Sequence, residues 1–231
     1  MKLKPATVNG RTARQAAIGR NVSLKDISQM AHNISGAWHN AAAHPDVDHE
    51  RSWYEEASQY IGSLAVGHSM PYDRSVAVVA ALSPGTSWER NLDLAEQALA
   101  GEEPNHAYGD CIRKAYALMA GSNISDTLGG RKVRSFYYGL LTAGDTGHVT
   151  IDRHSGTLAL YGEPTSISGR SASRANDVSN HLAKVGVYQS VVIAHRIVAA
   201  KVGRRVTDVQ SVTWEYWRLM YAYKVKQGEW F

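Results

Sequence analysis

The segment Leu128–His154, LGGRKVRSFYYGLLTAGDTGHVTIDRH, decides the predicted fold, because a glycine turn, an amphipathic helix and a second helix start follow one another in it. Behind the turn Gly129-Gly130, apolar residues recur at helical spacing: Val133, Phe136, Tyr137, Leu140 and Leu141. The segment ends in the run Val149-Thr150-Ile151-Asp152, whose aspartate precedes the next apolar stretch. We therefore expect Lys132 and Asp152 each to open a helix.

Lys132 and Asp152 also suggest a chemistry. An amine and a carboxylate brought into one pocket can act covalently on a sugar carbon, the amine as nucleophile and the carboxylate as proton acceptor or as a stabilising negative charge. Each residue alone would suggest less, because a lysine near a helix start is commonly a surface residue and an aspartate there is commonly an N-cap. The pair is the candidate catalytic centre.

The remainder of the chain predicts helices almost throughout. Ser23 with Asp26 resembles a capping box and predicts a helix from residue 23 to about Ala43. The nearly continuous apolar run from Ser75 to Leu82 predicts a helix at the buried centre of the fold. Further helices are expected around residues 53–64, from a cap at Thr86 to Leu99, and over 106–120, 152–161, 171–185 and 188–202, with Thr207-Asp208 capping the last. The predicted class is all-α.

Composition limits the kind of protein. The 231 residues suffice for one core, so we expect a flexible basic arm over 1–22 and a single domain of two packed lobes over 23–231. No apolar run approaches the roughly 20 residues of a membrane span, and no hydrophobic signal core begins the chain. The single cysteine, Cys111, excludes internal disulfides and thiolate-held clusters, and no histidine spacing suggests a metal. A cytoplasmic protein without membrane association, metal or cofactor is expected.

The distribution of charge favours a polyanionic partner. The net charge is +4, and six basic residues but no acidic residue precede Asp26. Further basic clusters surround Lys132 and occur near Arg170, Arg204 and Lys224. Clusters of this kind are typical of proteins that bind DNA or RNA.

Two motifs in order resemble one enzyme family. The first motif is Leu-Gly-Gly-Arg-Lys from Leu128, followed by a predicted helix and by the run Val-Thr-Ile-Asp-Arg-His that ends at His154. The second motif, Ala81-Leu82-Ser83-Pro84 followed by Thr86, lies upstream. Together they resemble the helix-hairpin-helix DNA glycosylase superfamily, in particular its endonuclease-III-like branch, over roughly residues 70–165. The resemblance implies a glycosylase-like all-α fold, with two helical lobes and a cleft between them.

The resemblance also implies roles for individual residues. Backbone amides of Gly129 and Gly130 would bind DNA phosphate, and a flipped-out nucleotide would meet Asp152 as the stabilising carboxylate and Lys132 as the Schiff-base nucleophile. Further DNA contacts are expected from residues beside these motifs: Arg131, Arg134, Arg153, His154, Ser83, Thr86, Trp88 and Asn91. The preferred function is a DNA N-glycosylase with AP lyase activity.

Two other functions stay open. The signatures Ala81–Asn91, Gly130–Tyr137 and Val149–His154 also resemble small actinobacterial and phage proteins related to thymine-hypermodification enzymes. Such an enzyme would replace a pyrophosphate on 5-hydroxymethyluracil in DNA with an amine. Arg131 and Lys132 would then bind the leaving group, and Asp152 would deprotonate the amine. The second alternative is a non-catalytic DNA-binding module. For every function we expect a monomer in a bacterial or phage-infected cell.

Overall fold

The computed structural model describes residues 7–8, 11–12, 22–48, 52–105, 107–162, 178 and 180–226. Two short strands, β1 (Thr7–Val8) and β2 (Arg11–Thr12), pair antiparallel, and every other described element is a helix. The all-α class is therefore confirmed, although the sequence did not predict the strands. The rest of the predicted arm, up to residue 21, lies outside the described residues.

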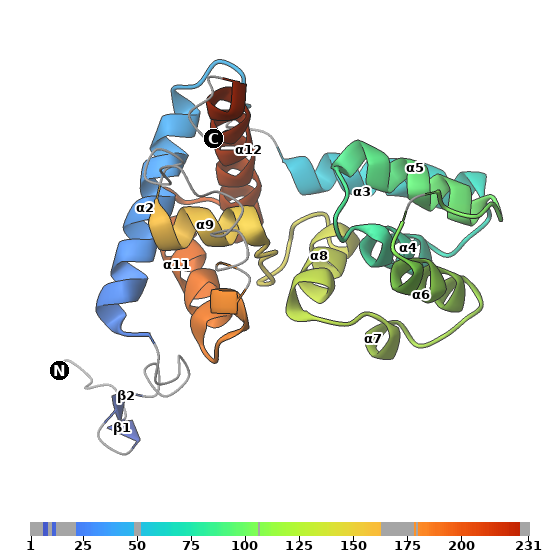
Figure 1. Cartoon of the computed structure of the whole chain (residues 1–231), viewed down its shortest axis with the longest axis horizontal. Helices are drawn as coiled ribbons and strands as arrows, with labels where there is room; N and C mark the ends of the chain where they lie inside the picture. Colours follow the sequence, from blue (N-terminus) through green and yellow to red (C-terminus); the bar gives the residue numbers. More distant parts are fainter. Residues whose placement is uncertain are drawn as a thin grey trace. The chain divides into compact units, whose positions relative to one another are not determined.

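The chain divides into two compact units. The first combines Met1–Arg51 with Ile151–Phe231, and the second is the intervening Ser52–Thr150 (Figure 1). Each unit is organised around one helix that the others contact. The prediction of a single domain over 23–231 stays a prediction.

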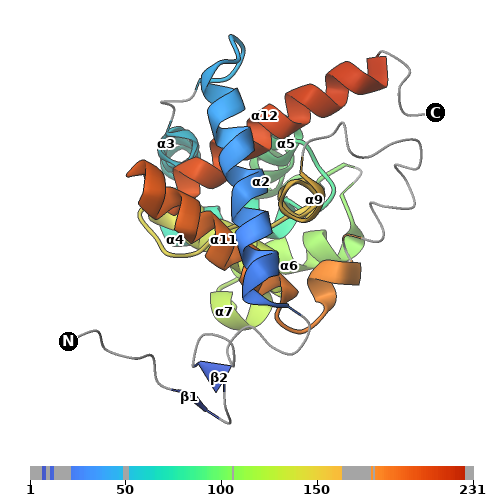
Figure 2. The ribbon, with the colours of Figure 1, turned by 90° about the vertical axis from the view of Figure 1, so that its left-hand side faces the viewer.

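In the first unit the central helix is α2 (Leu24–Ala42), which contacts α9 (Arg153–Tyr161), α11 (Val187–Val202) and α12 (Val206–Lys226). Figure 2 shows α2 running across this unit, with α9 seen end-on beside it. The predicted capping box is confirmed, because the Asp26 amide donates to Ser23 Oγ and the Ser23 amide donates to Asp26 Oδ2. Hydrogen bonds from Ser23 also lower the pKa of Asp26.

In the second unit the central helix is α4 (Tyr72–Leu82), which contacts α3 (Trp53–Gly67), α5 (Trp88–Leu99), α6 (Gly109–Met119) and α8 (Arg131–Leu141). The short helix α7 (Ile124–Thr127) follows α6. The segment from Ser75 to Leu82 exposes at most 2% of any residue's surface. The prediction that this run forms a buried centre is thus confirmed for the second unit.

Two predicted caps are wrong by one or two residues. Ser87, rather than Thr86, caps α5, because the Thr86 hydroxyl donates to the Ser83 carbonyl inside the preceding turn. The last helix already starts at Val206, and Asp208 pairs with Arg205 at 3.0 Å instead of capping the helix. The sequence also missed α7. Most of the helix predicted over 171–185 lies outside the described residues.

Among the helices that the structure describes, none has both the length and the apolar character required to cross a membrane.

Gly139 is required by the packing of α8 on α3. A Cβ at position 139 would lie 2.5 Å from Cε1 and 3.1 Å from Cζ of Tyr54. The Tyr54 ring is only 2% exposed, and its hydroxyl donates to Thr150 Oγ1 at 2.9 Å. The ring therefore has little room to move.

We expect Gly139→Ala to lower the free energy of unfolding by about 1–3 kcal/mol, because overpacking displaces a buried, hydrogen-bonded ring. Urea denaturation followed by circular dichroism measures the change. Gly62→Ala in α3 is the matched control, since nothing lies within 4 Å of its added Cβ. The control should be neutral or stabilising by up to about 1 kcal/mol. Equal stability of the two variants would contradict this packing.

Candidate functional site

A glycine hairpin joins α7 to α8 in the second unit. Leu128 ends α7 and is 1% exposed, so its side chain anchors the turn in the core. Gly130 has φ +74°, a conformation that side chains disfavour, and it precedes the first residue of α8. A Cβ on Gly130 would meet nothing within 4 Å. The predicted glycine turn followed by a helix is therefore present, with the outer side of Gly130 open.

Arg134 holds this hairpin together. Its Nε donates to the Leu128 carbonyl at 2.7 Å, and its Nη2 donates to the Ser125 carbonyl at 3.0 Å. Two hydrogen bonds from one guanidinium tie α8 back to the end of α7. Arg134 was expected to contact DNA; the structure shows it bonded to the protein backbone.

The start of α8 is basic and has no side-chain cap. Gly130 offers no side-chain acceptor, so the amides of Arg131, Lys132 and Val133 lie at the positive end of the helix. Arg131 is exposed and Lys132 is half-buried. Backbone N–H groups at such a helix start suit the oxygens of an anion such as phosphate.

Lys132 lies within electrostatic reach of Cys111 on α6. Burial raises the pKa of the Cys111 thiol and Asp110 adds to the rise, while the positive charges of Lys114 and Lys132 oppose it. Lys114 Nζ also lies 3.7 Å from the Cβ position of Gly129. The hairpin is therefore flanked by two lysines, one on α8 and one on α6.

The turn between α4 and α5 uses its hydroxyl groups internally. Ser83 Oγ donates to the Ala80 carbonyl at 2.9 Å, and Thr86 Oγ1 donates to the Ser83 carbonyl at 3.2 Å. Both residues are half-buried. As donors they shape the turn, and their expected contact with DNA stays a prediction.

Trp88 and Asn91 face the interior of the second unit. The Trp88 ring packs against Trp53, with centroids 4.8 Å apart, and against Phe136 at 6.3 Å. Asn91 is 2% exposed, and its Oδ1 has no hydrogen-bond partner among the described residues. The structure thus places Trp88 in an aromatic cluster with Trp53, Tyr54 and Phe136, and it places Asn91 in the core.

Asp152 begins α9 in the first unit, as predicted, and both of its carboxylate oxygens accept hydrogen bonds. Oδ1 accepts from the Ser155 amide at 2.8 Å, which is the N-cap contact. Oδ2 accepts from the indole Nε1 of Trp214 on α12, also at 2.8 Å. The carboxylate is half-buried. Two donors from different helices fix its orientation.

Aromatic side chains of α12 surround this helix start. The His154 ring lies 4.7 Å from that of Trp217 and 6.5 Å from that of Trp214. The Arg218 guanidinium sits 4.7 Å from the centroid of the Trp214 ring. His154 is half-buried, whereas Arg153 is exposed. Of the two predicted DNA contacts, Arg153 therefore faces solvent and His154 packs against tryptophan.

The predicted residues around Lys132 and Asp152 form two groups, one in each unit. Gly129, Gly130, Arg131, Lys132 and Arg134 lie together at the hairpin of the second unit. Asp152, Arg153 and His154 lie together at the start of α9 in the first unit.

Sequence reasoning missed Trp214 and Lys114. Trp214 lies on the last helix, and 62 positions separate it from Asp152, so no local pattern connects the two. Lys114 lies on α6, well before the hairpin it approaches. One feature of the sequence could have pointed to Trp214: its indole N–H is a hydrogen-bond donor that needs an acceptor when the ring is buried.

Within the described residues, no group of three or more His, Cys, Asp or Glu side chains could hold a metal ion. His195 on α11 is fully buried, with Nδ1 2.9 Å from the Val191 carbonyl. Burial lowers the pKa of His195 to about 4, so the ring is a neutral core residue near pH 7.

The hydrogen bond between Trp214 and Asp152 can be measured by a double-mutant cycle. Trp214→Phe removes the indole donor, and Asp152→Asn replaces one carboxylate oxygen while keeping an acceptor for the Ser155 amide. We expect each change to lower the free energy of unfolding by about 1 kcal/mol in urea denaturation. The double variant should lose at least about 0.5 kcal/mol less than the sum. Asp152→Asn with Trp53→Phe is the additive control; additivity in both pairs would refute the coupling.

The comparisons with known proteins place the chain in a family. A family of unknown function, DUF7178, matches residues 17–220. No curated protein and no solved structure matches the chain. Because the match covers most of the sequence, this protein belongs to the DUF7178 family.

Proposed function

We propose that this protein is a DNA-binding enzyme that acts on a flipped-out nucleotide as a DNA N-glycosylase with AP lyase activity. The main support for the proposal is the Asp152 carboxylate, which the Ser155 amide and the Trp214 indole hold in place at the start of α9. A fixed carboxylate is a preorganised negative charge. Such a charge stabilises the positive charge that develops on a sugar while its base departs.

The order of elements supports a helix-hairpin-helix glycosylase fold. The short helix α7, the glycine turn, α8, the Val149–Ile151 run and the Asp152-capped α9 follow one another as the sequence resemblance implies. The proposal assigns the nucleophilic attack to Lys132 and the stabilising negative charge to Asp152.

The proposed reaction proceeds in two stages. The bond between C1′ and the base breaks, and the base leaves with the bonding electrons while Asp152 stabilises the cationic sugar. The neutral amine of Lys132 forms a bond to C1′ and loses a proton, and ring opening gives a Schiff base. Loss of a C2′ proton then breaks the bond between C3′ and the phosphate oxygen.

Charge and backbone geometry support DNA as the partner. The chain carries a net charge of +4, and the uncapped amides of α8 lie beside Arg131 and Lys132. These groups can bind phosphate without reading a base. We expect this binding to position the DNA and the Asp152 site to perform the chemistry.

A second candidate function is a transferase that replaces a pyrophosphate on 5-hydroxymethyluracil with an amine. The specific observation in its favour is the cationic start of α8, where a basic pair adjoins amides that have no side-chain cap. A pyrophosphate leaving group carries more negative charge than a DNA phosphate and suits such a group well. Asp152 would then take the proton of the incoming amine.

We expect Asp152→Asn to retain DNA binding and to lose at least about a hundredfold in turnover, because one oxygen of the anionic carboxylate is lost. The substrates are oligonucleotides containing uracil, 5-hydroxymethyluracil, its pyrophosphate ester or an oxidised pyrimidine. Mass spectrometry of the nucleosides distinguishes a released base from a base that has gained an amine. Asp145→Asn, an exposed carboxylate in the preceding loop, is the control. Full activity of Asp152→Asn would eliminate both enzymatic functions and leave a DNA-binding module.

The role of Lys132 separates the two enzymes. In a glycosylase with lyase activity, borohydride should trap a covalent complex with DNA containing an abasic site, and Lys132→Ala should abolish it. Lys184→Ala, which removes an exposed lysine of the first unit, is the control. If the wild type forms no adduct, Lys132 is not a nucleophile. Unchanged trapping by Lys132→Ala would assign the adduct to another amine.

A further inference from the structure

Tyr108 is an exposed aromatic residue that is nevertheless held in place. It is 65% exposed, yet Cε2 and Cζ of its ring lie only 2.7 Å and 3.2 Å from the Cβ position of Gly85. Gly85 has φ +77°, so both its backbone conformation and this contact require glycine. One side of the ring therefore lies against the turn between α4 and α5, while most of its surface faces solvent.

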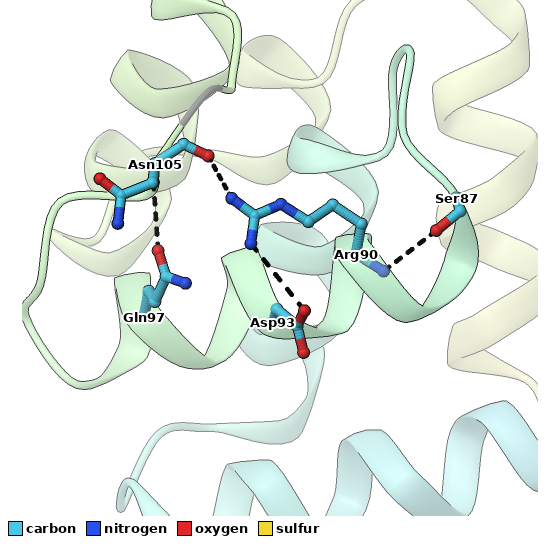
Figure 3. A network of polar contacts seen from close by, with 5 residues as sticks. All are labelled: Ser87, Arg90, Asp93, Gln97 and Asn105. Atoms are coloured by element: carbon cyan, nitrogen blue, oxygen red, sulfur yellow. Dashed lines mark hydrogen bonds and ion pairs between the residues drawn. The ribbon is translucent and has the colours of Figure 1, made fainter.

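The segment that leads to Tyr108 is tied to α5. Arg90 donates through Nη2 to the Asn105 carbonyl, and the Asn105 amide donates to Gln97 Oε1 at 3.1 Å (Figure 3). Asp93 lies 3.9 Å from the guanidinium of Arg90. These contacts hold the backbone of Asn105, three residues before Tyr108, in place before a ligand binds, which reduces the entropy lost on binding.

Helix α6 connects this ring to the basic hairpin. Tyr108 is its N-cap, the buried Cys111 follows three residues later, and the half-buried Lys114 lies one turn beyond Cys111. The six residues from Tyr108 to Lys114 correspond to about 9 Å along a helix axis. That distance is close to the span of roughly three stacked nucleotides, at about 3.4 Å each. The Tyr108 ring thus lies at the start of α6, and Lys114 lies further along the helix, near the hairpin.

The charge at the hairpin end is predominantly positive. Asp110 pairs with Arg113 and with Lys114, whose Nζ is 2.6 Å from the carboxylate. Lys132 and Arg131 add two further positive charges at the start of α8. Around the hairpin the basic residues Arg113, Lys114, Arg131 and Lys132 outnumber the carboxylates Asp110 and Asp126, which suits the phosphates of a nucleic acid strand.

We propose that this α6 surface, formed by Tyr108, Lys114 and the hairpin Gly129-Gly130, binds an unpaired stretch of DNA. A base stacks on the Tyr108 ring, and a phosphate of the same strand contacts Lys114 and the hairpin amides. An unpaired strand is required because bases inside a duplex already stack on one another. The inference rests on the proposed function and specifies the form of DNA that it acts on.

Binding of a fluorescent twelve-residue oligothymidylate, measured by anisotropy, tests the stacking. Stacking on one aromatic ring contributes about 1–3 kcal/mol, so Tyr108→Ala should raise Kd about 5- to 150-fold. Tyr108→Phe should bind like the wild type, and Tyr108→Leu should resemble Tyr108→Ala because it lacks an aromatic face. Tyr60→Ala, which removes another exposed tyrosine of the second unit, is the control.

A second ligand and a salt series separate the two contacts. An abasic strand of equal length should bind the wild type and Tyr108→Ala with the same Kd, because it has no base to stack. Lys114→Gln should reduce the slope of log Kd against log salt concentration by about 0.7, whereas Tyr108→Ala should leave that slope unchanged.

The outcomes distinguish this inference from the proposed function. If the wild type binds oligothymidylate and Tyr108→Ala binds it equally well, the α6 surface is wrong while DNA turnover at Asp152 can still stand. If Tyr108→Ala weakens binding but Asp152→Asn retains full activity, the surface stands and the enzymatic proposal fails. A wild type that binds neither single-stranded nor duplex DNA overturns both.

Discussion

The chain is buried on both sides of the peptide bond between Thr150 and Ile151, and the position of Asp152 depends on that burial. Val149, Thr150 and Ile151 are each at most 8% exposed. Buried backbone and hydroxyl groups need hydrogen-bond partners. Tyr54 of the second unit donates to the Thr150 hydroxyl, and Tyr188 of the first unit accepts from the Ile151 amide at 3.3 Å. Each unit thus anchors its own end of the run with a tyrosine, and α9 starts at a defined place.

The carboxylate of Asp152 has a structural role at the start of α9. An N-cap aspartate needs only one oxygen for the helix amide, and here the second oxygen receives the Trp214 indole. A cap that served α9 alone would not need a donor from α12. The pair of contacts fixes the carboxylate in one orientation, a condition for stabilising charge on a reacting sugar.

In the second unit, the close packing at Gly139 and the basic hairpin lie at opposite ends of α8. Tyr54 on α3 leaves no room at Gly139 for a side chain, and the aromatic cluster around Trp53 fills the same region. The start of α8 carries the open hairpin and Lys132, and Lys114 on α6 lies near that hairpin. A rigid core with a basic, partly aromatic surface is a suitable support for a nucleic acid strand.

The sequence by itself determined the helical class, the buried run of α4, the capping box of α2 and the N-cap position of Asp152. These features depend on periodicity and on side-chain to backbone contacts within four residues, so local sequence contains them. Only the tertiary structure decided that Trp214 clamps Asp152, that Arg134 serves the hairpin backbone, and that Tyr108 packs on Gly85. Those contacts join residues from different helices or turns, and their partners depend on how the helices pack rather than on spacing along the chain.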